Sequence, residues 1–173
     1  MEVTPRIEQA KSELEVTPVI QQALSNDATM LATVCKAVKE HWGDEGMAIL
    51  QEAMEKQFSP GIALAARAAG IRIGDGTIED WAKLEKFAGR FMGIDAEWEI
   101  TPARGLQRMV KCPYAKRYAK AFGGTCPEVL IGCERAIAHT VNPHLEVRGQ
   151  KYMTTGDTVC ELVVEWEKGY EPK

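Results

Sequence analysis

The stretch TIEDWAKLEKFAGRFMGIDAEWEITPARGLQRMVK (residues 77–111) changes its hydrophobic period halfway along, and this change decides the fold. Its first part opens with Thr77 and Asp80, the Thr-x-x-Asp arrangement of a capping box, in which each side chain bonds to the other residue's backbone N–H. The apolar residues that follow recur at three- and four-residue steps and share one helical face: Trp81, Leu84, Ala88 and Phe91. We therefore expect a helix that begins just after Thr77.

The second part of this stretch alternates with period two, as strands do. Residues 96–101 and 105–111 alternate, and Thr-Pro-Ala-Arg-Gly between them is typical of a turn. The pattern returns in residues 144–153 and 158–166, around Thr-Thr-Gly-Asp, a four-residue connection that suits a hairpin. The sequence thus predicts two β-hairpins.

Helical segments flank both hairpins. Residues 19–40 and 44–58 carry apolar residues mostly three or four apart, and Pro60 is expected to end the second of these helices. The Cys-Pro pairs at Cys112 and Cys126 each place a proline at a first helical position. The order of elements predicts an α+β fold, in which a helical N-terminal half packs on a small antiparallel sheet built from two hairpins with two intervening helices.

Length and composition bound the organisation of the chain. With 173 residues, 45% of them hydrophobic, it can bury one core, so we expect one domain at residues 19–173 after a flexible arm at residues 1–18. A net charge of −4 without a Lys/Arg block argues against nucleic acid as a partner. Since the polar start lacks a signal-peptide core and no apolar run approaches the roughly 18 residues of a membrane span, we expect a cytoplasmic protein without a membrane partner.

In a cytoplasmic chain, five cysteines are expected to be reduced thiols. Cys112 and Cys126 would each cap a helix, and the positive end of a helix favours the thiolate, the form that attacks substrates or binds metals. Cys133 follows Cys126 by seven residues and so shares its helical face. Glu134 lies at the border of that face, where a carboxylate can line a cleft without complete desolvation, whereas His139 falls opposite.

The last hairpin adds further candidate residues. If its strands pair symmetrically about the turn, Cys160 lies opposite Lys151, whose charge would lower the thiol pKa. Asn142 ends the preceding helix and Asp157 ends the turn, so polar groups gather where helix ends meet a hairpin tip, a good place for a pocket. Strand alternation points Asp157 away from Cys160, so its carboxylate either caps the turn or faces the mouth of the pocket.

Each of these signals also has a purely structural explanation. Packing alone accounts for Cys35, and it accounts for any other single cysteine, because cysteine is among the most often buried residues. Asn142-Pro143 can be a helix stop, Thr-Thr-Gly-Asp a turn, and Glu134 a solvated helix flank. The cysteine spacings match no common zinc or iron–sulfur pattern, and no phosphate loop, nucleophile elbow or dinucleotide fingerprint occurs, so we predict no metal and no cofactor.

Several short motifs together indicate a family. They are KCPYAKRYAKAFG (residues 111–123), Cys-Glu (133–134), NPHLEVRGQKYMTTGDTVCELVVEW (142–166) and, upstream, VKEHWGDEGMAILQEAM (38–54). With these the chain resembles the L-2-amino-thiazoline-4-carboxylic acid hydrolase family over about residues 30–166. The resemblance selects Cys112, Cys133, Glu134, Asn142, Pro143, Gly156, Asp157 and Cys160, while Cys126-Pro127 is not part of the pattern. This family is distantly similar to 4-vinyl-reductase-type small-molecule-binding domains, an analogy that favours the same fold class.

The resemblance implies a hydrolase that opens a small carboxylated cyclic amidine or thiazoline-type substrate in cysteine and sulfur metabolism. A thiolate, or a water activated by Asp157 or Glu134, would attack the carbon between two heteroatoms. Asn142 or a helix N-terminus would stabilise the anionic intermediate, and Arg148 or Lys151 would hold the substrate carboxylate. The catalytic candidates are then Cys112, Cys133, Glu134, Asp157 and Cys160. The alternative is a non-catalytic small-molecule-binding or sensor domain with the same pocket.

Self-association is a further expectation. The amphipathic N-terminal helices and the four tryptophans exceed what a short sheet can cover. We therefore expect a homo-oligomer that buries part of the helical layer.

Overall fold

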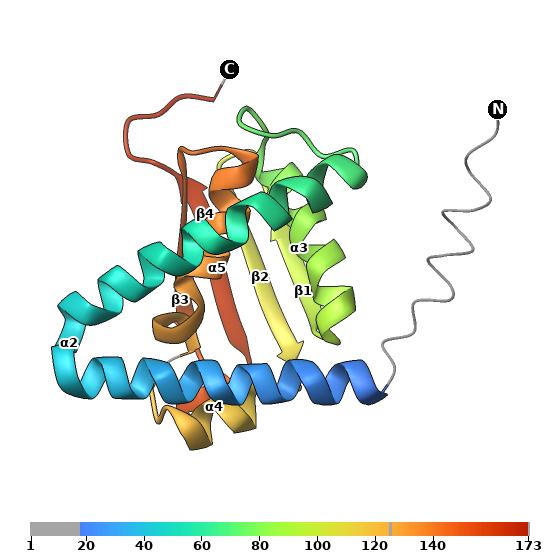
Figure 1. Cartoon of the computed structure of the whole chain (residues 1–173). Helices are drawn as coiled ribbons and strands as arrows, with labels where there is room; N and C mark the ends of the chain where they lie inside the picture. Colours follow the sequence, from blue (N-terminus) through green and yellow to red (C-terminus); the bar gives the residue numbers. More distant parts are fainter. Residues whose placement is uncertain (1–17, 125, 173) are drawn as a thin grey trace.

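The computed structural model describes residues 18–124 and 126–172, and within them it confirms the predicted α+β fold. The helices and an antiparallel sheet form separate layers, and the long N-terminal helical segment crosses the domain (Figure 1). The predicted arm at residues 1–18 lies outside the described residues except for its last residue. In the described part of the chain, no helix has the length and apolar character needed to cross a membrane.

The helical segment α2 (Pro18–Ala68) folds back on itself at Gly43 and so forms two helices (Figure 1). Gly43 has φ 59° and ψ −144°, a conformation that residues with a side chain rarely adopt. The break that was predicted between residues 40 and 44 is therefore confirmed.

Pro60 does not end the second of these helices, so the prediction of a break there is wrong. A proline removes one backbone N–H and crowds the preceding turn, but Pro60 and Lys56, whose carbonyl loses its partner, both lie at exposed positions of the helix. The Ser59 hydroxyl donates to the Glu55 carbonyl in the same turn at 2.7 Å. The helix continues to Ala68 and adds Ala66 to the core.

Helix α3 (Ile78–Met92) begins at the predicted capping box. The Asp80 N–H donates to Thr77 Oγ1 at 3.3 Å and the Thr77 N–H donates to Asp80 Oδ2 at 3.0 Å. Arg72 adds a charged hydrogen bond to the same carboxylate at 2.9 Å. Of the predicted apolar face, Trp81 and Leu84 are fully buried, whereas Phe91 at the far end is exposed.

The described strands are β1 (Asp95–Ile100), β2 (Arg104–Lys111), β3 (Leu145–Lys151) and β4 (Cys160–Trp166), and they form one antiparallel sheet in the order β1-β2-β4-β3. The predicted hairpins, β1 with β2 and β3 with β4, are confirmed. Pairing between β2 and β4 joins them into a single sheet. Helices can therefore cover one face of both hairpins at once.

The second hairpin differs from the prediction in its connection and its register. Residues 152–159 join the strands, with a short 3-10 helix, η1 (Met153–Thr155), in place of a four-residue turn. An irregularity between Gly149 and Lys151 pairs Lys151 with Glu161 instead of Cys160. Because a shift of one residue moves a side chain to the other face of the sheet, the predicted contact between Lys151 and Cys160 is wrong.

Helices α4 (Ala115–Ala121) and α5 (Cys126–Val141) connect the hairpins. Helix α5 begins at Cys126, close to the predicted start, whereas α4 begins two residues after Pro113, where a start was predicted. The Cys112 thiol still accepts hydrogen bonds from the N–H groups of Tyr114 and Ala115, which are the contacts of a capping residue.

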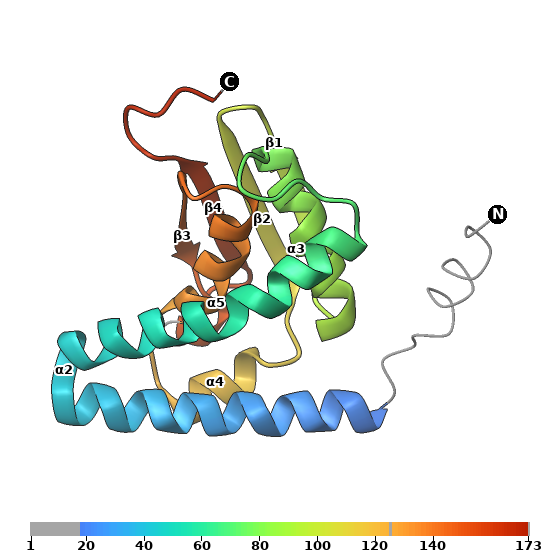
Figure 2. The ribbon, with the colours of Figure 1, turned by 45° about the horizontal axis from the view of Figure 1, so that its top comes forward.

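Helix α5 lies between the sheet and α2 (Figures 1 and 2). On its sheet side, Ile137 and Val141 join a buried cluster with Trp81, Leu145 and Val164. On its other side, Arg135 and His139 face the Glu55 carboxylate at 2.9 and 2.6 Å. The face of α5 that the sequence placed opposite the core is thus covered by α2. A second cluster, with Cys35, Tyr118 and Val129, joins the first half of α2 to α4 and α5.

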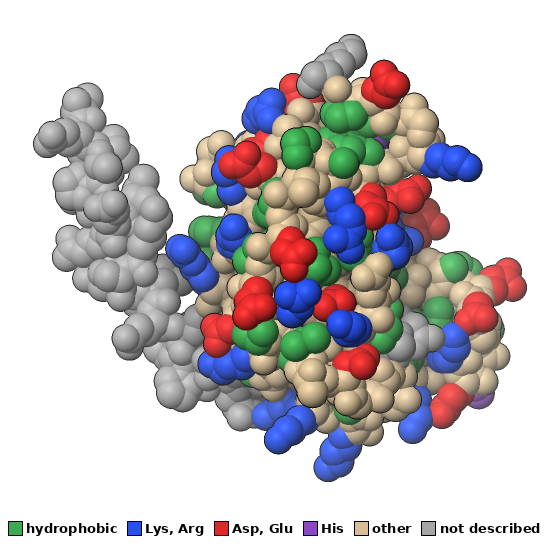
Figure 3. Space-filling model, turned by 180° about the vertical axis from the view of Figure 1, so that it is seen from behind, with side chains coloured by type: hydrophobic (Ala, Val, Ile, Leu, Met, Phe, Trp, Pro, Cys, Tyr) green, Lys and Arg blue, Asp and Glu red, His purple; other side chains and the backbone are tan. Residues whose placement is uncertain are grey.

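The sheet face turned away from the helices carries intermingled acidic and basic side chains (Figure 3). Leu106 and Val163 are buried on this face beneath the charges. The ion pairs above them are Arg108 with Glu161 (3.0 Å), Glu99 (3.4 Å) and Glu97 (3.6 Å), Lys151 with Glu161 (3.1 Å), and Arg148 with Glu165 (2.8 Å).

Apolar side chains remain exposed along the outer side of α2. Met30, Val34, Trp42 and Ile49 keep between 46% and 65% of their surface accessible. An exposed apolar stripe of this kind is typical of a surface that a second copy covers. The homo-oligomer stays a prediction for this surface.

Replacing Gly132 by alanine is expected to destabilise the protein. Gly132 of α5 lies against the backbone of α2, where an added Cβ would collide with the Gln51 carbonyl oxygen and lie 2.9 Å from the Met54 Cβ. We expect Gly132→Ala to lower the free energy of unfolding by about 1–3 kcal/mol in urea denaturation. Gly61→Ala is the matched control, because nothing lies within 4 Å of its added Cβ and alanine favours a helix. Equal effects of the two substitutions would contradict the close approach of α5 to α2.

Candidate functional site

The structure brings the cysteine thiols into one region where α4, α5 and the start of β4 meet. Cys126 interacts electrostatically with Cys112, Cys133 and Cys160, and Cys112 with Cys160. Tyr118 is buried among them. We call Cys112, Cys126, Cys133 and Cys160 the thiol cluster. Cys35 of α2 is fully buried beside it, next to Cys133.

Burial keeps these thiols protonated. It raises the pKa of Cys35 to about 11 and that of Cys133 to about 12, and it also raises the pKa values of Cys112, Cys126 and Cys160. The prediction that helix N-termini favour thiolates here is therefore wrong, because desolvation outweighs the hydrogen bonds that Cys112 receives from Tyr114 and Ala115. Within the described ranges, no three His, Cys, Asp or Glu side chains are placed to hold a metal ion.

Asp157 lies exposed at the tip of the second hairpin, where it caps the turn. Its Oδ2 accepts the Tyr152 N–H at 2.8 Å, and the Cys160 sulfur accepts the neighbouring Met153 N–H at 3.2 Å. The Thr154 hydroxyl accepts the N–H of Cys126 at 3.2 Å and so ties this turn to the start of α5. Of the two roles that the sequence left open for Asp157, the geometry favours turn capping.

The predicted substrate-binding residues do not come together. Asn142 is buried at the end of α5, where its side chain donates to the Gly76 carbonyl at 3.1 Å and accepts the His144 N–H at 3.0 Å. Arg148 and Lys151 lie on the outer face of the sheet in ion pairs with glutamates. These contacts give Asn142 a structural role. The ion pairs hold Arg148 and Lys151 on the outer face of the sheet, away from the thiol cluster.

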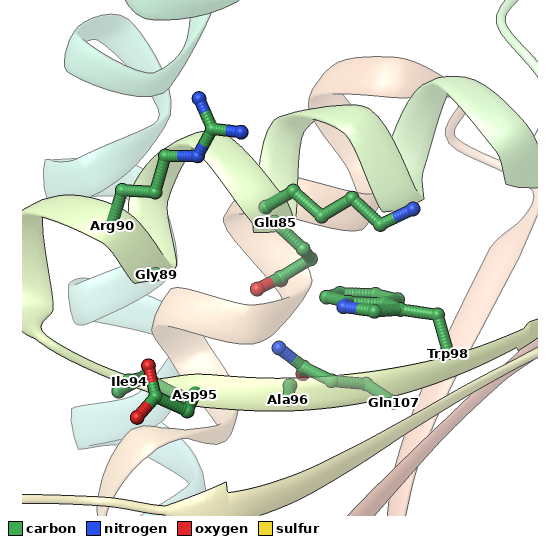
Figure 4. A pocket seen from close by; sticks show the side chains of 9 residues that line it. Glu85, Gly89, Arg90, Ile94, Asp95, Ala96, Trp98 and Gln107 are labelled. Carbon is green, nitrogen blue, oxygen red and sulfur yellow. The ribbon is translucent and has the colours of Figure 1, made fainter.

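A pocket of about 370 Å³ lies instead between α3 and the strands β1 and β2 (Figure 4). Glu85 points into it from α3, Gln107 points toward Glu85 from β2, and Trp98 closes one side. Glu85 and Gln107 are only 5% and 3% exposed. The remaining lining residues are Lys86, Gly89, Arg90, Ile94, Asp95 and Ala96.

Behind this pocket, Glu134 of α5 forms a hydrogen bond with Glu85. Burial raises the pKa of Glu85 well above its ordinary value, and the charge of Glu134 and the hydrogen bond to it raise it further, while Gln107 and Trp81 act in the opposite direction. Burial also raises the pKa of Glu134. A hydrogen bond between two carboxyl groups needs a proton on one of them, so the two hold a proton in common. We call Glu85 and Glu134 the carboxyl pair.

Buried polar atoms with few protein partners gather around this pair. Among the described residues, Glu85 Oε1, Glu134 Oε2 and Gln107 Oε1 receive no N–H donor at hydrogen-bond distance, so the proton shared by the two carboxyl groups is their partner there, and Trp81 Nε1 interacts with Glu85 alone. Such atoms are rare in folded proteins, and each costs about 1–3 kcal/mol when left unsatisfied. Their gathering at one pocket indicates a place for a polar ligand.

The sequence contained a signal for this pocket that the motif search missed. Glu85 follows Trp81 by four residues, so a carboxyl group sits on the apolar face of α3. Gln107 similarly lies within the alternating pattern of β2, on the side that faces the helices. Glu134 links the carboxyl pair to the thiol cluster, because it also interacts with Cys126 and Cys133.

Comparisons with known proteins show similarity of fold to two solved structures. No protein-family profile matches the chain, and no curated protein does. The phenol-responsive sensory domain of the transcription activator PoxR, solved with phenol, superposes with a TM-score of 0.58 at 13% identity, over 83% of this chain and 76% of that one. Trafficking protein particle complex subunit 3 from Naegleria fowleri, covalently bound to palmitic acid, superposes with a TM-score of 0.55 at 16% identity, over 82% of this chain and 96% of that one.

Slow alkylation is expected for every thiol of the folded protein. A rise in pKa from 9.0 to about 11, as for Cys35, lowers the thiolate fraction near neutral pH by about 100-fold. Iodoacetamide labelling followed by peptide mass spectrometry should show slow modification of all five cysteines until the protein is unfolded in guanidinium. One thiol that reacts rapidly in the folded state would contradict this and favour a nucleophilic role.

The parent protein is expected to become less stable as pH rises, because its folded state keeps a proton on Glu85. Glu85→Gln is expected to remove this pH dependence. In the unfolded state the carboxyl group of Glu85 ionises above about pH 4.5, whereas its raised pKa keeps the proton bound in the folded state. Between these two pKa values the folded protein binds more protons than the unfolded one, so its stability falls as pH rises. The variant should gain relative to the parent by up to about 1.4 kcal/mol per pH unit above 4.5 in urea unfolding. Glu79→Gln, at an exposed position of α3, is the matched control. Parallel stability curves for parent and Glu85→Gln would refute the buried proton.

Proposed function

We propose that this chain is a small-molecule-binding domain whose ligand occupies the pocket beside Glu85, Gln107 and Trp98. Its volume of about 370 Å³ falls in the range of known ligand sites and suits a molecule built on one ring. In this proposal the pocket differs from the thiol cluster on which the sequence-based hypothesis centred.

One observation carries the proposal. Glu85 and Gln107 come from different elements, are more than nine-tenths buried, line the same pocket, and each carries an oxygen that receives no N–H donor at hydrogen-bond distance from the described residues. A side chain that served only packing would be apolar, because apolar side chains avoid the desolvation of an unsatisfied polar group.

The structural neighbours are compatible with this proposal at the level of fold. One is a sensory domain solved with phenol, and the other is a trafficking subunit bound to palmitic acid. Both hold a small organic molecule, although they share little sequence with this chain. A sensor, in which binding alters a surface that another protein reads, is one form that such a function takes.

A second candidate function is hydrolysis of a small carboxylated heterocycle, which the family resemblance implies. It is favoured by the contact of Glu134 with both the carboxyl pair and the thiols of Cys126 and Cys133. A carboxyl pair with one proton supplies both an acid and a base for water attack. The raised thiol pKa values count against a cysteine nucleophile.

The binding function is tested with single-ring probes. Phenol and benzyl alcohol carry a hydrogen-bond donor and toluene does not, so the first two should raise the melting temperature and change the tryptophan fluorescence more than toluene does. Gln107→Leu replaces the amide by an apolar side chain of comparable size, and we expect it to weaken binding by about 10-fold or more. Gln150→Leu, at an exposed position of β3, should leave binding unchanged. Binding that is equal in both variants, or absent for every probe, would contradict the proposed pocket.

A further inference from the structure

We propose that the pocket recognises a small organic amine bound as its cation, and that binding releases the proton that Glu85 and Glu134 share. This inference rests on the proposed binding function and names the chemical class of its ligand.

The balance of donors and acceptors points to an amine. Around the carboxyl pair, three buried oxygens, on Glu85, Glu134 and Gln107, receive no N–H donor at hydrogen-bond distance from the described residues, and the single such donor there, Trp81 Nε1, already interacts with Glu85. An ammonium group offers three donors and no acceptor. A carboxylate ligand would bring further acceptors beside two carboxyl groups and would be repelled by them, although Lys86 and Arg90 line the same pocket.

The aromatic wall is suited to a cation as well. The Lys86 ammonium lies 5.2 Å from the centre of the Trp98 ring, so this ring face already accommodates a positive charge. Trp81 meets Trp98 edge to face at 5.7 Å, which continues the aromatic surface toward Glu85. A ligand with one ring and an ammonium group would contact the tryptophan with the ring and the carboxyl pair with the nitrogen.

The charged side chains around the carboxyl pair contribute to the net charge that a ligand meets in the pocket. Lys86 and Arg90 line the pocket from α3, and Asp95 lines it from β1 with Lys111 at 3.4 Å. From α5, Glu134 faces Glu85 with the protonated thiols of Cys126 and Cys133 behind it. In the pocket's depth the carboxyl pair is thus the acidic group without a basic partner among the described residues.

The proton balance follows from these neighbours. The empty pair carries one proton and one negative charge. When R–NH₃⁺ lies beside it, the positive charge favours the doubly ionised pair, so Glu85 gives its proton to a buffer base while the amine keeps its own. No covalent bond other than this O–H bond breaks. A neutral donor such as an alcohol gives no such reason for proton loss.

Calorimetry with matched probes tests the proposal. Benzylamine is an alkylamine that stays mostly protonated up to about pH 9, somewhat below lysine because its ring withdraws electrons, and benzyl alcohol is its neutral counterpart. Titrations at one pH in phosphate and in Tris, buffers that differ in ionisation enthalpy, count the protons released. We expect about one proton per bound benzylamine and none per benzyl alcohol, and an affinity for benzylamine that rises by up to about 10-fold per pH unit while the pair holds its proton.

Glu85→Gln should abolish the proton release and weaken benzylamine binding by about 10-fold or more, a loss larger than the one it causes for benzyl alcohol, which has no charge for the lost carboxylate to attract. Glu79→Gln, exposed on the same helix, should behave like the parent. Thermal unfolding checks that both variants are folded, and Glu134→Gln, which removes the other half of the carboxyl pair, repeats the test if Glu85→Gln is not. Benzyl alcohol binding without benzylamine binding, or benzylamine binding without proton release, would overturn the amine proposal and leave the binding function standing. Failure of both probes would overturn both.

Discussion

Helix α5 has to fit between α2 and the sheet, and the rest of the domain depends on that fit. Gly132 allows the two backbones to approach, Arg135 and His139 meet Glu55 on one side, and apolar residues meet the sheet on the other. Because α5 is covered on two sides, little of its surface remains accessible to water. The carboxyl group of Glu134 therefore extends into the interior, where it meets Glu85.

The carboxyl pair is costly to a protein of this size. Two carboxyl groups lose their hydration there, and sharing a proton relieves this penalty in part. Well-packed apolar side chains at the same positions would be at least as stabilising. The proposed binding function gives this costly group beside a pocket a purpose that packing does not.

Local patterns predicted the parts of this fold that local interactions determine. The capping box at Thr77, the break near Gly43 and both hairpins depend on residues close in sequence. Pro60 was misjudged because its tolerance depends on exposure, and Lys151 because an irregularity in β3 shifts the register.

The candidate site was harder to predict than the fold, since it is assembled from distant elements. Burial by α2, α4 and α5 decides the protonation of the thiols, and motif spacing does not report burial. The pocket needs α3, β1, β2 and α5 together. Its trace in the sequence was a single acidic residue, Glu85, on an otherwise apolar helical face.

The charged outer face of the sheet has a consequence for how copies of this protein meet. Strand β1 is an edge strand of the sheet, and among the described residues no strand pairs with its outer side. Glu97 and Glu99, which bind Arg108 within one molecule, would face the same acidic residues if two β1 strands paired antiparallel. Like charges directly opposite each other oppose that register, so the ion-pair network that orders the sheet also protects its edge against fibril growth.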